Sequence, residues 1–422
     1  MTAASPARRF ALAVLLDIEH GPTLGERLAE HDVEALPRRE RDFLHELALG
    51  TLRSRGRLDH ALARLVSRPL LELDPSVLAV LRLGAHQILN LRVPARAAVN
   101  ESVELAREVQ PAASGLVNAV LRRLDREGAP PLPDPLAEPL AWLTSGGSLP
   151  AWIARRWIAN WGAAVAVERA TAGLVPPITA FRANPRRATA LESAPLAVPG
   201  ALEAPGADLA ALSRDGAVYV QDLGSQLVAA LAASGPRVLD ACAAPGGKST
   251  MIGDLLGDGG RVVAIERSAA RLRSMRRLVE RWGSTNLAIV RGDAGRPPLG
   301  ASFDTVLLDA PCSGLGTLAR HPDLRWRARA EDLPRHAERQ RALLEALAPW
   351  VRSGGRLVFS VCSLEPEETR DVVTPFLARH SEFQPAERPA WCDRFRDGEF
   401  VVSKPERDGS DGFFAAVLQR TA

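Results

Sequence analysis

The chain contains few cysteines and lacks long apolar runs. Its four cysteines are widely spread over 422 residues with no Cys-x-x-Cys pair, so neither a disulfide framework nor a zinc site is indicated. No apolar run approaches the roughly 18 residues that a membrane span needs. The short apolar run after Arg8 and Arg9 is interrupted by acidic residues and lacks a cleavage site. We expect a cytoplasmic protein with free thiols, no metal and no membrane partner.

Lysine is also scarce, because only Lys248 and Lys404 stand among the 53 basic residues. Lys248 lies in the most glycine-rich motif, which indicates that a compact ammonium group is needed there. The net charge of +3 supports a nucleic-acid partner only weakly. Local groups of arginine could neutralise phosphates, or could simply form solvated surface. These groups are Arg53, Arg55 and Arg57; Arg182, Arg186 and Arg187; and Arg320, Arg325, Arg327 and Arg329.

The length and the local patterns predict three domains. Residues 1–140 have helical apolar spacing, with helices expected at 58–66, 76–91, 98–109 and 115–124 before a proline-rich linker. Residues 141–230 read as a small α+β subdomain that begins with a tryptophan-bearing helix. Residues 231–422 alternate between short apolar strands and helices, which is typical of a parallel sheet covered by helices on both faces. The strands are expected at 237–241, 261–265, 287–290, 303–308 and 356–361, and helices at 269–282 and 334–350.

The first of these strands leads into the glycine-rich segment DACAAPGGKST at residues 240–250. Ligands of such sheets bind at the carboxyl ends of the strands, and Gly246 and Gly247 let the backbone approach a ligand just before a helix. A phosphate-binding P-loop is the alternative, but that motif needs glycine where this chain has Cys242. Glu266 ends the second strand at the place where a carboxylate binds ribose hydroxyls, and Asp293 after the third could receive an adenine amino group. Ribose and adenine without a diphosphate loop favour S-adenosylmethionine over a dinucleotide.

The fourth and fifth strands deliver Asp309, Cys312 and Cys362. Neighbouring strand ends would bring the two cysteines into one pocket beside a carboxylate. Carbon 5 of cytosine becomes nucleophilic only after a group such as a thiolate adds to carbon 6. The alternative is that both are buried core cysteines, the usual fate of this residue. Cys242 and Cys392 are interpreted as structural.

Four motifs resemble those of the RNA cytosine-5 methyltransferases, and specifically the bacterial 16S (small-subunit) rRNA methyltransferases of the Sun or Fmu type. They are CAAPGGK (242–248), DAPCSGLGT (309–317) continuing to Trp326, CSLEPEE (362–368) and DGFF (411–414). The N-terminal segments RDFL (41–44), LRLGAHQIL (81–89), VNESVELA (99–106) and GLVNAVLRR (115–123) resemble the RNA-binding NusB domain of that family. The resemblance implies a Rossmann-like methyltransferase domain, an RRM-like α+β subdomain and an N-terminal all-helical NusB-like domain.

The resemblance also implies roles for individual residues. Cys362 would be the nucleophile, Cys312 would assist product release, Asp309 would activate the base, and Lys248 would contribute nearby. The expected cofactor contacts are Cys242, Ala243, Ala244, Pro245, Gly246, Gly247, Lys248, Glu266, Asp293 and Asp309. The expected RNA contacts are Arg182, Asn184, Arg320, His321 and Arg325. Two positions depart from the family pattern, since Val361 stands where threonine is usual and Thr369 where asparagine is common.

The expected partner is small-subunit rRNA, bound by a monomer that does not act on DNA. Two alternatives stay open. The same chemistry could act on tRNA or another RNA, or the fold could serve only as the scaffold of an rRNA-binding assembly factor.

Overall fold

The computed structural model describes residues 4–18, 33 and 36–421, which form two compact units. The first unit comprises residues 1–176 together with 318–330, and the second comprises 177–317 together with 331–422. The second unit therefore carries both the glycine-rich motif and the two cysteine-bearing strand ends. No helix of the described residues is both long enough and apolar enough to span a bilayer.

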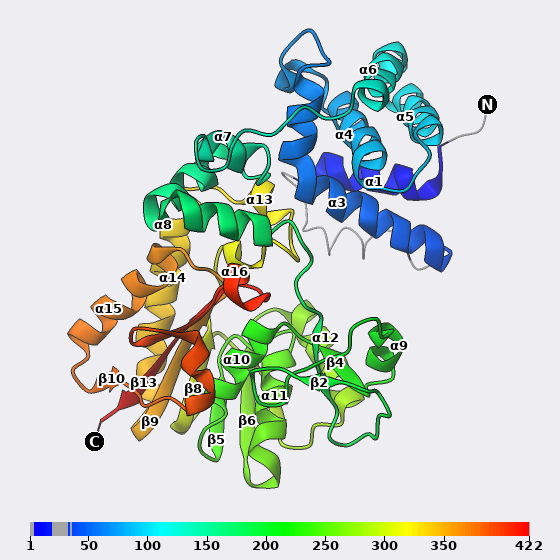
Figure 1. Ribbon diagram of the computed structural model, residues 1–422. Helices are drawn as coiled ribbons and strands as arrows, with labels where there is room; N and C mark the ends of the chain where they lie inside the picture. Colours follow the sequence, from blue (N-terminus) through cyan, green and yellow to red (C-terminus); the bar gives the residue numbers. More distant parts are fainter. Residues whose placement is uncertain (1–3, 19–32, 34–35, 422) are drawn as a thin grey trace. The chain divides into compact units, whose positions relative to one another are not determined.

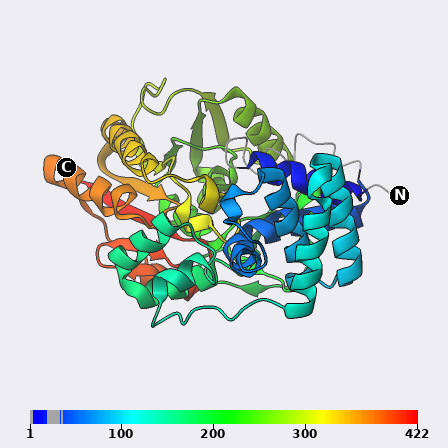
Figure 2. The same ribbon diagram turned by 90° about the horizontal axis from the view of Figure 1, so that it is seen from above.

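The first unit is entirely helical in its described part (Figures 1 and 2). Its longer helices are α1 (Pro6–Asp17), α3 (Arg38–Ala63), α4 (Pro75–Asn90), α5 (Ala95–Val109), α6 (Ser114–Glu127), α7 (Pro139–Thr144) and α8 (Ala151–Ala172). Short turns complete it at η2 (Leu70–Glu72), η3 (Pro111–Ala113) and α13 (Leu324–Arg327). The predicted helices at 76–91, 98–109 and 115–124 are confirmed within a few residues. Asp74 caps α4 by accepting a hydrogen bond from the Ser76 amide.

Helix α3 is one 26-residue element where separate helical segments were expected. Gly50 and Gly56 lie inside it, and a Cβ on either would come within 2.3 Å of His86 or of the Thr144 carbonyl. These glycines therefore serve close packing and do not end the helix.

The second unit begins with a small antiparallel sheet. Its strands β1 (Ala180–Ala183), β2 (Ala194–Pro195), β3 (Leu202–Glu203) and β4 (Val218–Val220) have the order β2-β3-β1-β4, with α9 (Leu209–Arg214) before the last strand. These strands lie within residues 141–230, where the sequence predicts a small α+β subdomain, but the tryptophan-bearing helix α8 expected to begin that subdomain belongs to the first unit.

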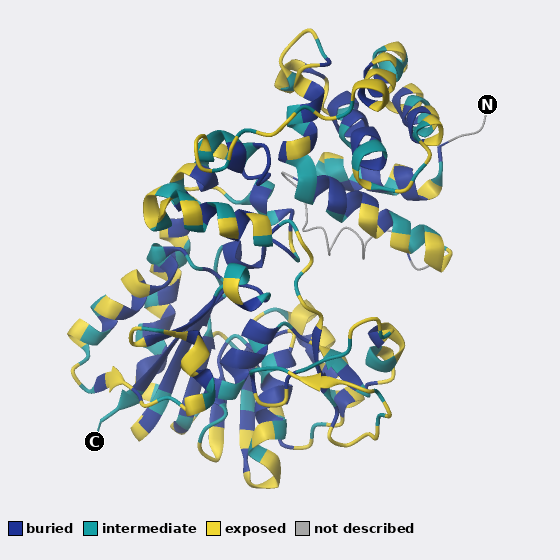
Figure 3. Ribbon diagram, viewed as in Figure 1, coloured by how far each residue is buried: buried dark blue, intermediate teal, exposed yellow. Residues whose placement is uncertain are grey.

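A nine-stranded sheet forms the core of the second unit, with the order β11-β12-β13-β9-β8-β5-β6-β7 and with β10 also paired to β13. Five neighbours run parallel, as predicted: β7 (Leu287–Arg291), β6 (Arg261–Glu266), β5 (Arg237–Asp240), β8 (Phe303–Asp309) and β9 (Val351–Val361). The antiparallel strands are β10 (Phe383–Pro385), β11 (Arg396–Asp397), β12 (Phe400–Ser403) and β13 (Phe413–Arg420). Figure 3 shows the central strands as largely buried.

Helices of the second unit connect these strands and cover the sheet. They are α10 (Leu223–Ala232), α11 (Gly247–Leu256), α12 (Ala269–Trp282), α14 (Asp332–Leu347), α15 (Arg370–Arg379) and α16 (Pro405–Asp408), with short turns η4 (Gly257–Gly259), η5 (Leu315–Thr317), η6 (Ala348–Trp350), η7 (Pro366–Glu368) and η8 (Ala390–Phe395). The expected domain limits at 140/141 and 230/231 fall inside α7 and α10. Apolar spacing predicts helices well but does not say which neighbour a helix packs against, so the division into three domains stays a prediction.

Candidate active site

Two thiols meet at the carboxyl edge of the large sheet. Cys312 follows β8 and Cys362 follows β9, and these strands run parallel with Asp309 opposite Ser360. The two sulfur atoms lie 3.3 Å apart. The hydrogen bond with Cys362, together with burial, raises the pKa of the Cys312 thiol well above its usual value. Cys312 is therefore held as a thiol next to Cys362.

Lys248 lies in the same site and pairs with Asp309. Its ammonium donates to Asp309 Oδ2 at 2.7 Å, and the Ser360 hydroxyl donates to Oδ1 at 2.8 Å. Burial opposes the charged form of Lys248, yet the adjacent Asp309 carboxylate raises the pKa of Lys248 above its ordinary value. Its ammonium also lies 5.2 Å from the centre of the Phe413 ring. A lysine, a carboxylate and two thiols thus lie together at this edge of the sheet.

Close backbone contacts hold the two cysteine-bearing loops. The Gly316 amide donates to the Cys362 carbonyl at 3.0 Å, and the Gly412 amide donates to the Gly316 carbonyl at 2.8 Å. A Cβ at Gly316 would lie 2.0 Å from the Gly412 oxygen. Glycine at 316 is therefore a steric requirement of the thiol pair.

Glu368 is a buried group that the sequence did not single out. One of its oxygens accepts from the Ser313 amide at 2.8 Å and from Gln340 Nε2 at 3.2 Å, and the other accepts from the Ser313 hydroxyl. Ser313 follows Cys312 directly, and Glu368 lies six residues after Cys362. The carboxylate therefore ties one cysteine loop to the other.

A cavity of about 240 Å³ lies at the carboxyl ends of β5, β6 and β7. Cys242, Glu266 and Asp293 line it, as the sequence predicted for a cofactor site. The Ser268 amide holds the buried Glu266 carboxylate at 2.7 Å, and the Gly295 amide holds Asp293 at 2.8 Å. The sequence carried no signal for the other lining residues, which are brought to the cavity by the fold. They include Arg267, Ser268, Arg271, Gly292, Ala294, Pro311, Arg339 and Leu343.

The glycine-rich turn shapes one side of this region. Ala243 and Ala244 are buried, and Gly246 adopts φ 105° with Met275 2.9 Å from where its Cβ would lie. Glycine at 246 thus serves the packing of the turn against α12, and of the turn residues expected to contact the cofactor only Cys242 lines the cavity. Burial raises the pKa of Cys242 to about 12, which makes this thiol unreactive. Buried Cys392 donates to the Pro389 carbonyl, away from the thiol pair.

Two of the expected RNA contacts, Arg182 and Asn184, are buried in the second unit. Arg182 donates to Gln221, Asp254, Thr250 and the Gly247 carbonyl. Burial lowers its pKa to about 10. The Asn184 amide donates to the carbonyls of Gly216 and Trp282. Both side chains are hydrogen-bonded inside the protein, so an RNA contact would require these bonds to open.

The other three expected contacts belong to the first unit. Arg325 is buried and donates to the carbonyls of Gly147 and Ser148 at 3.2 Å and to that of Gly173. Arg320 is half-buried and His321 is exposed. Of the five expected RNA contacts, only His321 is an exposed residue, and partial burial still lowers its pKa.

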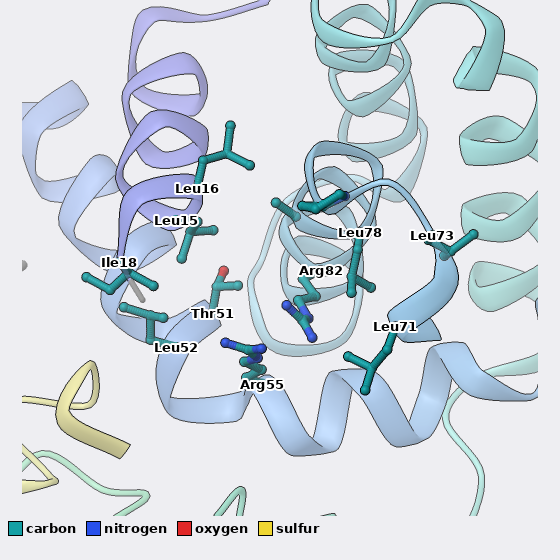
Figure 4. Close-up of a pocket in the computed structure, with 12 residues that line it drawn as sticks. Leu15, Leu16, Ile18, Thr51, Leu52, Arg55, Leu71, Leu73, Leu78 and Arg82 are labelled. Atoms are coloured by element: carbon teal, nitrogen blue, oxygen red, sulfur yellow. The ribbon is translucent and has the colours of Figure 1, made fainter. Parts of the chain in front are cut away.

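The first unit holds a further cavity of about 380 Å³ between α1, α3 and α4 (Figure 4). Its lining is mostly leucine, with two arginines. Arg82 is paired with Asp59 at 2.7 Å, and Arg55 stacks over the Trp326 ring. None of the expected site residues lines this cavity.

A parallel sheet of this order, with a cavity at its carboxyl edge and a carboxylate after each of two adjacent strands, defines a Rossmann-like methyltransferase. The family model described as 16S rRNA methyltransferase RsmB/F matches residues 229–419, and the NusB family model matches residues 5–126. The chain is 36% identical over its whole length to ribosomal RNA small subunit methyltransferase B of Thermus thermophilus, with 99% of that protein covered. It is 32% identical to the Vibrio cholerae protein of the same name, with 98% of the chain and 96% of the relative covered. The chain therefore belongs to the RsmB/F family of 16S rRNA methyltransferases.

Solved structures agree with this fold. PH0851 aligns over 100% of both chains with a TM-score of 0.77 and 24% identity. A methyltransferase homolog protein from Pyrococcus horikoshii aligns over 65% of this chain and 96% of its own, with a TM-score of 0.55 and 25% identity.

Proposed function

We propose that the protein transfers a methyl group from S-adenosyl-L-methionine to carbon 5 of a cytosine in 16S rRNA, through a covalent bond between Cys362 and carbon 6. The observation that carries the proposal is the thiol pair, 3.3 Å apart beside the Lys248–Asp309 ion pair. A ring carbon that is not nucleophilic needs a group that adds to its neighbour, and a thiolate is suited to this. The second thiol, Cys312, contacts the first and would then help to release the methylated product from Cys362.

The cavity at β5, β6 and β7 fits S-adenosylmethionine. Glu266 and Asp293 line this cavity; Glu266 would present its carboxylate to the ribose hydroxyls, and Asp293 would accept from the adenine amine. When bound, this cofactor supplies the electrophilic methyl group.

The chain's own residues would act in sequence on a cytosine that has left its stack. Cys362 adds to carbon 6 as a thiolate, the form that this addition requires. Asp309 is ion-paired with Lys248 in the resting site. Lys248, 2.7 Å away, is the group that can provide the proton when Asp309 contacts the ring nitrogen. After methylation, Cys312, which rests as a thiol, first loses its own proton to solvent. As a thiolate it then takes the proton from carbon 5, the electrons of that C–H bond restore the ring double bond, and Cys362 leaves carbon 6 as a thiolate.

The 16S rRNA substrate is supported by the relatives named small subunit methyltransferase B and by the NusB match at residues 5–126. A cytoplasmic, monomeric enzyme that uses no metal and does not act on DNA is part of the same proposal. Transfer to tRNA is the second candidate, because the site chemistry itself does not distinguish the RNAs.

Replacing each thiol tests the covalent mechanism. Cys362→Ala should abolish methylation and form no adduct. Cys312→Ala should remain covalently attached to RNA, and a denaturing gel with labelled rRNA should reveal a slower band. An adduct formed by the Cys362→Ala protein would reverse the roles of the two thiols, and no adduct with either variant would contradict the mechanism.

A further inference from the structure

Helix α12 in the second unit presents a strongly basic outer face. Six arginines fall within residues 267–281, all of them exposed, and Glu280 is the one acidic residue among them. The opposite face of the helix consists of Leu272, Met275, Leu278 and Trp282, which are all buried in the protein. The whole chain is nearly balanced in charge, with 53 basic and 50 acidic residues, so this helix departs from the average.

Four of these arginines, at positions 273, 276, 277 and 281, form what we call the arginine stripe. Positions 273, 277 and 281 are one helical turn apart and lie on one side of α12. In the described part of the chain, no carboxylate pairs with any of the four, and Arg277 only donates to the Ser274 hydroxyl at 3.0 Å. Like charges four residues apart destabilise a helix by roughly 0.2–0.5 kcal/mol per pair. The stripe therefore does not stabilise the helix.

Some exposed arginines of the same unit pair with a carboxylate. Arg335 pairs with Asp332, Arg370 with Asp397 and Arg379 with Glu345, and these arginine side chains are 77%, 51% and 53% exposed. Others, such as Arg261 and Arg291, have no carboxylate partner among the described residues. The arginine stripe is therefore distinguished by the clustering of four such arginines on one helix.

The small sheet extends the basic surface at the end of α12. Exposed Arg187 donates to the Arg281 carbonyl at 3.2 Å and to the carbonyl of Asp215. The amide of Asn184 donates to the Trp282 carbonyl at 2.9 Å, which fixes this loop against the helix (Figure 1). A fifth guanidinium therefore continues the line of the stripe.

We propose that the arginine stripe and Arg187 form a docking surface for the phosphate backbone of the RNA substrate. The inference rests on the proposed RNA methylation and names a surface outside the thiol and cofactor pockets. Cations alone suffice to bind phosphates by displacing counterions, and guanidinium groups bind phosphate oxygens in pairs. Arginines four residues apart are separated by about 6 Å along the helix axis. The stripe can therefore follow several phosphates along one RNA strand.

A membrane surface fits this helix less well. A basic helix on a bilayer inserts its apolar face, but here that face is buried in the protein core. A protein partner would need apolar or aromatic anchors, whereas the side chains between these arginines on the exposed face are Ser274 and Glu280. RNA is therefore the partner that the surface fits.

The test replaces three stripe residues with glutamine in the full-length protein, Arg273→Gln, Arg276→Gln and Arg277→Gln together. The matched control carries Arg335→Gln, Arg370→Gln and Arg379→Gln, which removes the same charge from arginines that are paired. Affinity for unmodified small-subunit rRNA is measured at several salt concentrations. The stripe variant should bind roughly tenfold more weakly at about 0.1 M salt, and its log–log salt slope should fall by about 2–3.

At saturating RNA the stripe variant should retain the wild-type kcat, because it leaves the pocket unchanged. Wild-type affinity and slope in the stripe variant, or an equal loss in the control, would overturn the proposal. Wild-type protein that binds RNA without methylating it would contradict the proposed function, while the stripe comparison would still give its own answer.

Discussion

Glu368 sits between the two cysteine loops without a cationic partner among the described residues, and it satisfies its carboxylate through Ser313 and Gln340. The buried Glu368 side chain is stabilised by these hydrogen bonds alone. Loss of the bonds from Ser313 would therefore also free the Ser313 loop to move. Because Ser313 follows Cys312, we infer that Glu368 positions the Cys312 thiol, to which we assign product release.

Glu368→Ala should therefore slow release of the methylated product by about tenfold or more. A shift of the Cys312 thiol that raises the activation barrier of release by about 1.4 kcal/mol has that effect. The covalent RNA adduct should accumulate, though less than with Cys312→Ala. Glu368→Gln keeps an acceptor for the Ser313 amide and should accumulate less adduct than the alanine variant. Equal adduct levels in the wild type and both variants would show that Glu368 acts on folding only.

Asp240 introduces a pH dependence of stability. The Ser249 hydroxyl donates to one of its oxygens at 2.6 Å, and the other has no partner. Burial raises its pKa to about 6, against about 3.9 for an ordinary aspartate. Between about pH 4 and pH 6 the folded protein keeps the Asp240 proton, whereas the unfolded chain loses it. The contribution of this protonated carboxyl to the free energy of unfolding is thus complete below about pH 4 and is lost as the pH rises through about 6.

Asp240→Asn cannot ionise and still accepts from Ser249. Its free energy of unfolding, relative to the wild type, should rise between about pH 4 and pH 6.5 by about 3 kcal/mol and then level off. Urea unfolding of both proteins across that range measures the difference. A difference that does not change with pH would show that Asp240 is not the titrating group.

At the scale of elements, the segment 318–330 is unusual, because it follows the Cys312 loop in sequence but packs with the N-terminal helices. Arg325 anchors it by donating to carbonyls at Gly147, Ser148 and Gly173, and burial lowers the pKa of this arginine to about 9. Trp326 Nε1 donates to the Leu52 carbonyl at 2.9 Å.

Arg325→Met leaves those carbonyls without donors and should cost about 3 kcal/mol, which corresponds to a Tm lower by roughly 5–10 °C for the first unit. Arg329→Met, at an exposed position in the same segment, is the control and should change little. Hydrogen exchange at residues 139–176 locates the effect. Unchanged exchange in the Arg325 variant would contradict an anchoring role.

The elements most visible in the sequence were those with strong periodicity. The helix at 269–282 was predicted to the residue, and the five parallel strands within one residue at each end except that β9 begins five residues earlier. Strand order then brought Cys312 and Cys362 together. Burial was harder to predict, since Arg182 and Arg325 were expected to contact RNA, yet the fold encloses both side chains. The role of Glu368 depends on Ser313 and Gln340, which are distant in sequence, and the arginine stripe lies on one predicted helix but the sequence does not show that its arginines have no carboxylate partner.

At the scale of the whole molecule, the chain crosses between its two units more than once. It leaves the second unit after Thr317 and returns at Glu331. The segment that follows the Cys312 loop is thus part of the unit that carries the NusB match. The two units are interleaved along the sequence, so neither is a contiguous stretch that truncation could isolate cleanly.

The central claim is methyl transfer to carbon 5 of a cytosine in 16S rRNA. It is tested most directly by incubating the full-length protein with methyl-labelled S-adenosylmethionine and, separately, unmodified small-subunit rRNA, large-subunit rRNA and tRNA. The account predicts label in the small-subunit rRNA alone, recovered as 5-methylcytosine after digestion. Label in tRNA would keep the chemistry and overturn the substrate, and no label in any RNA from a protein that binds the cofactor would contradict the account.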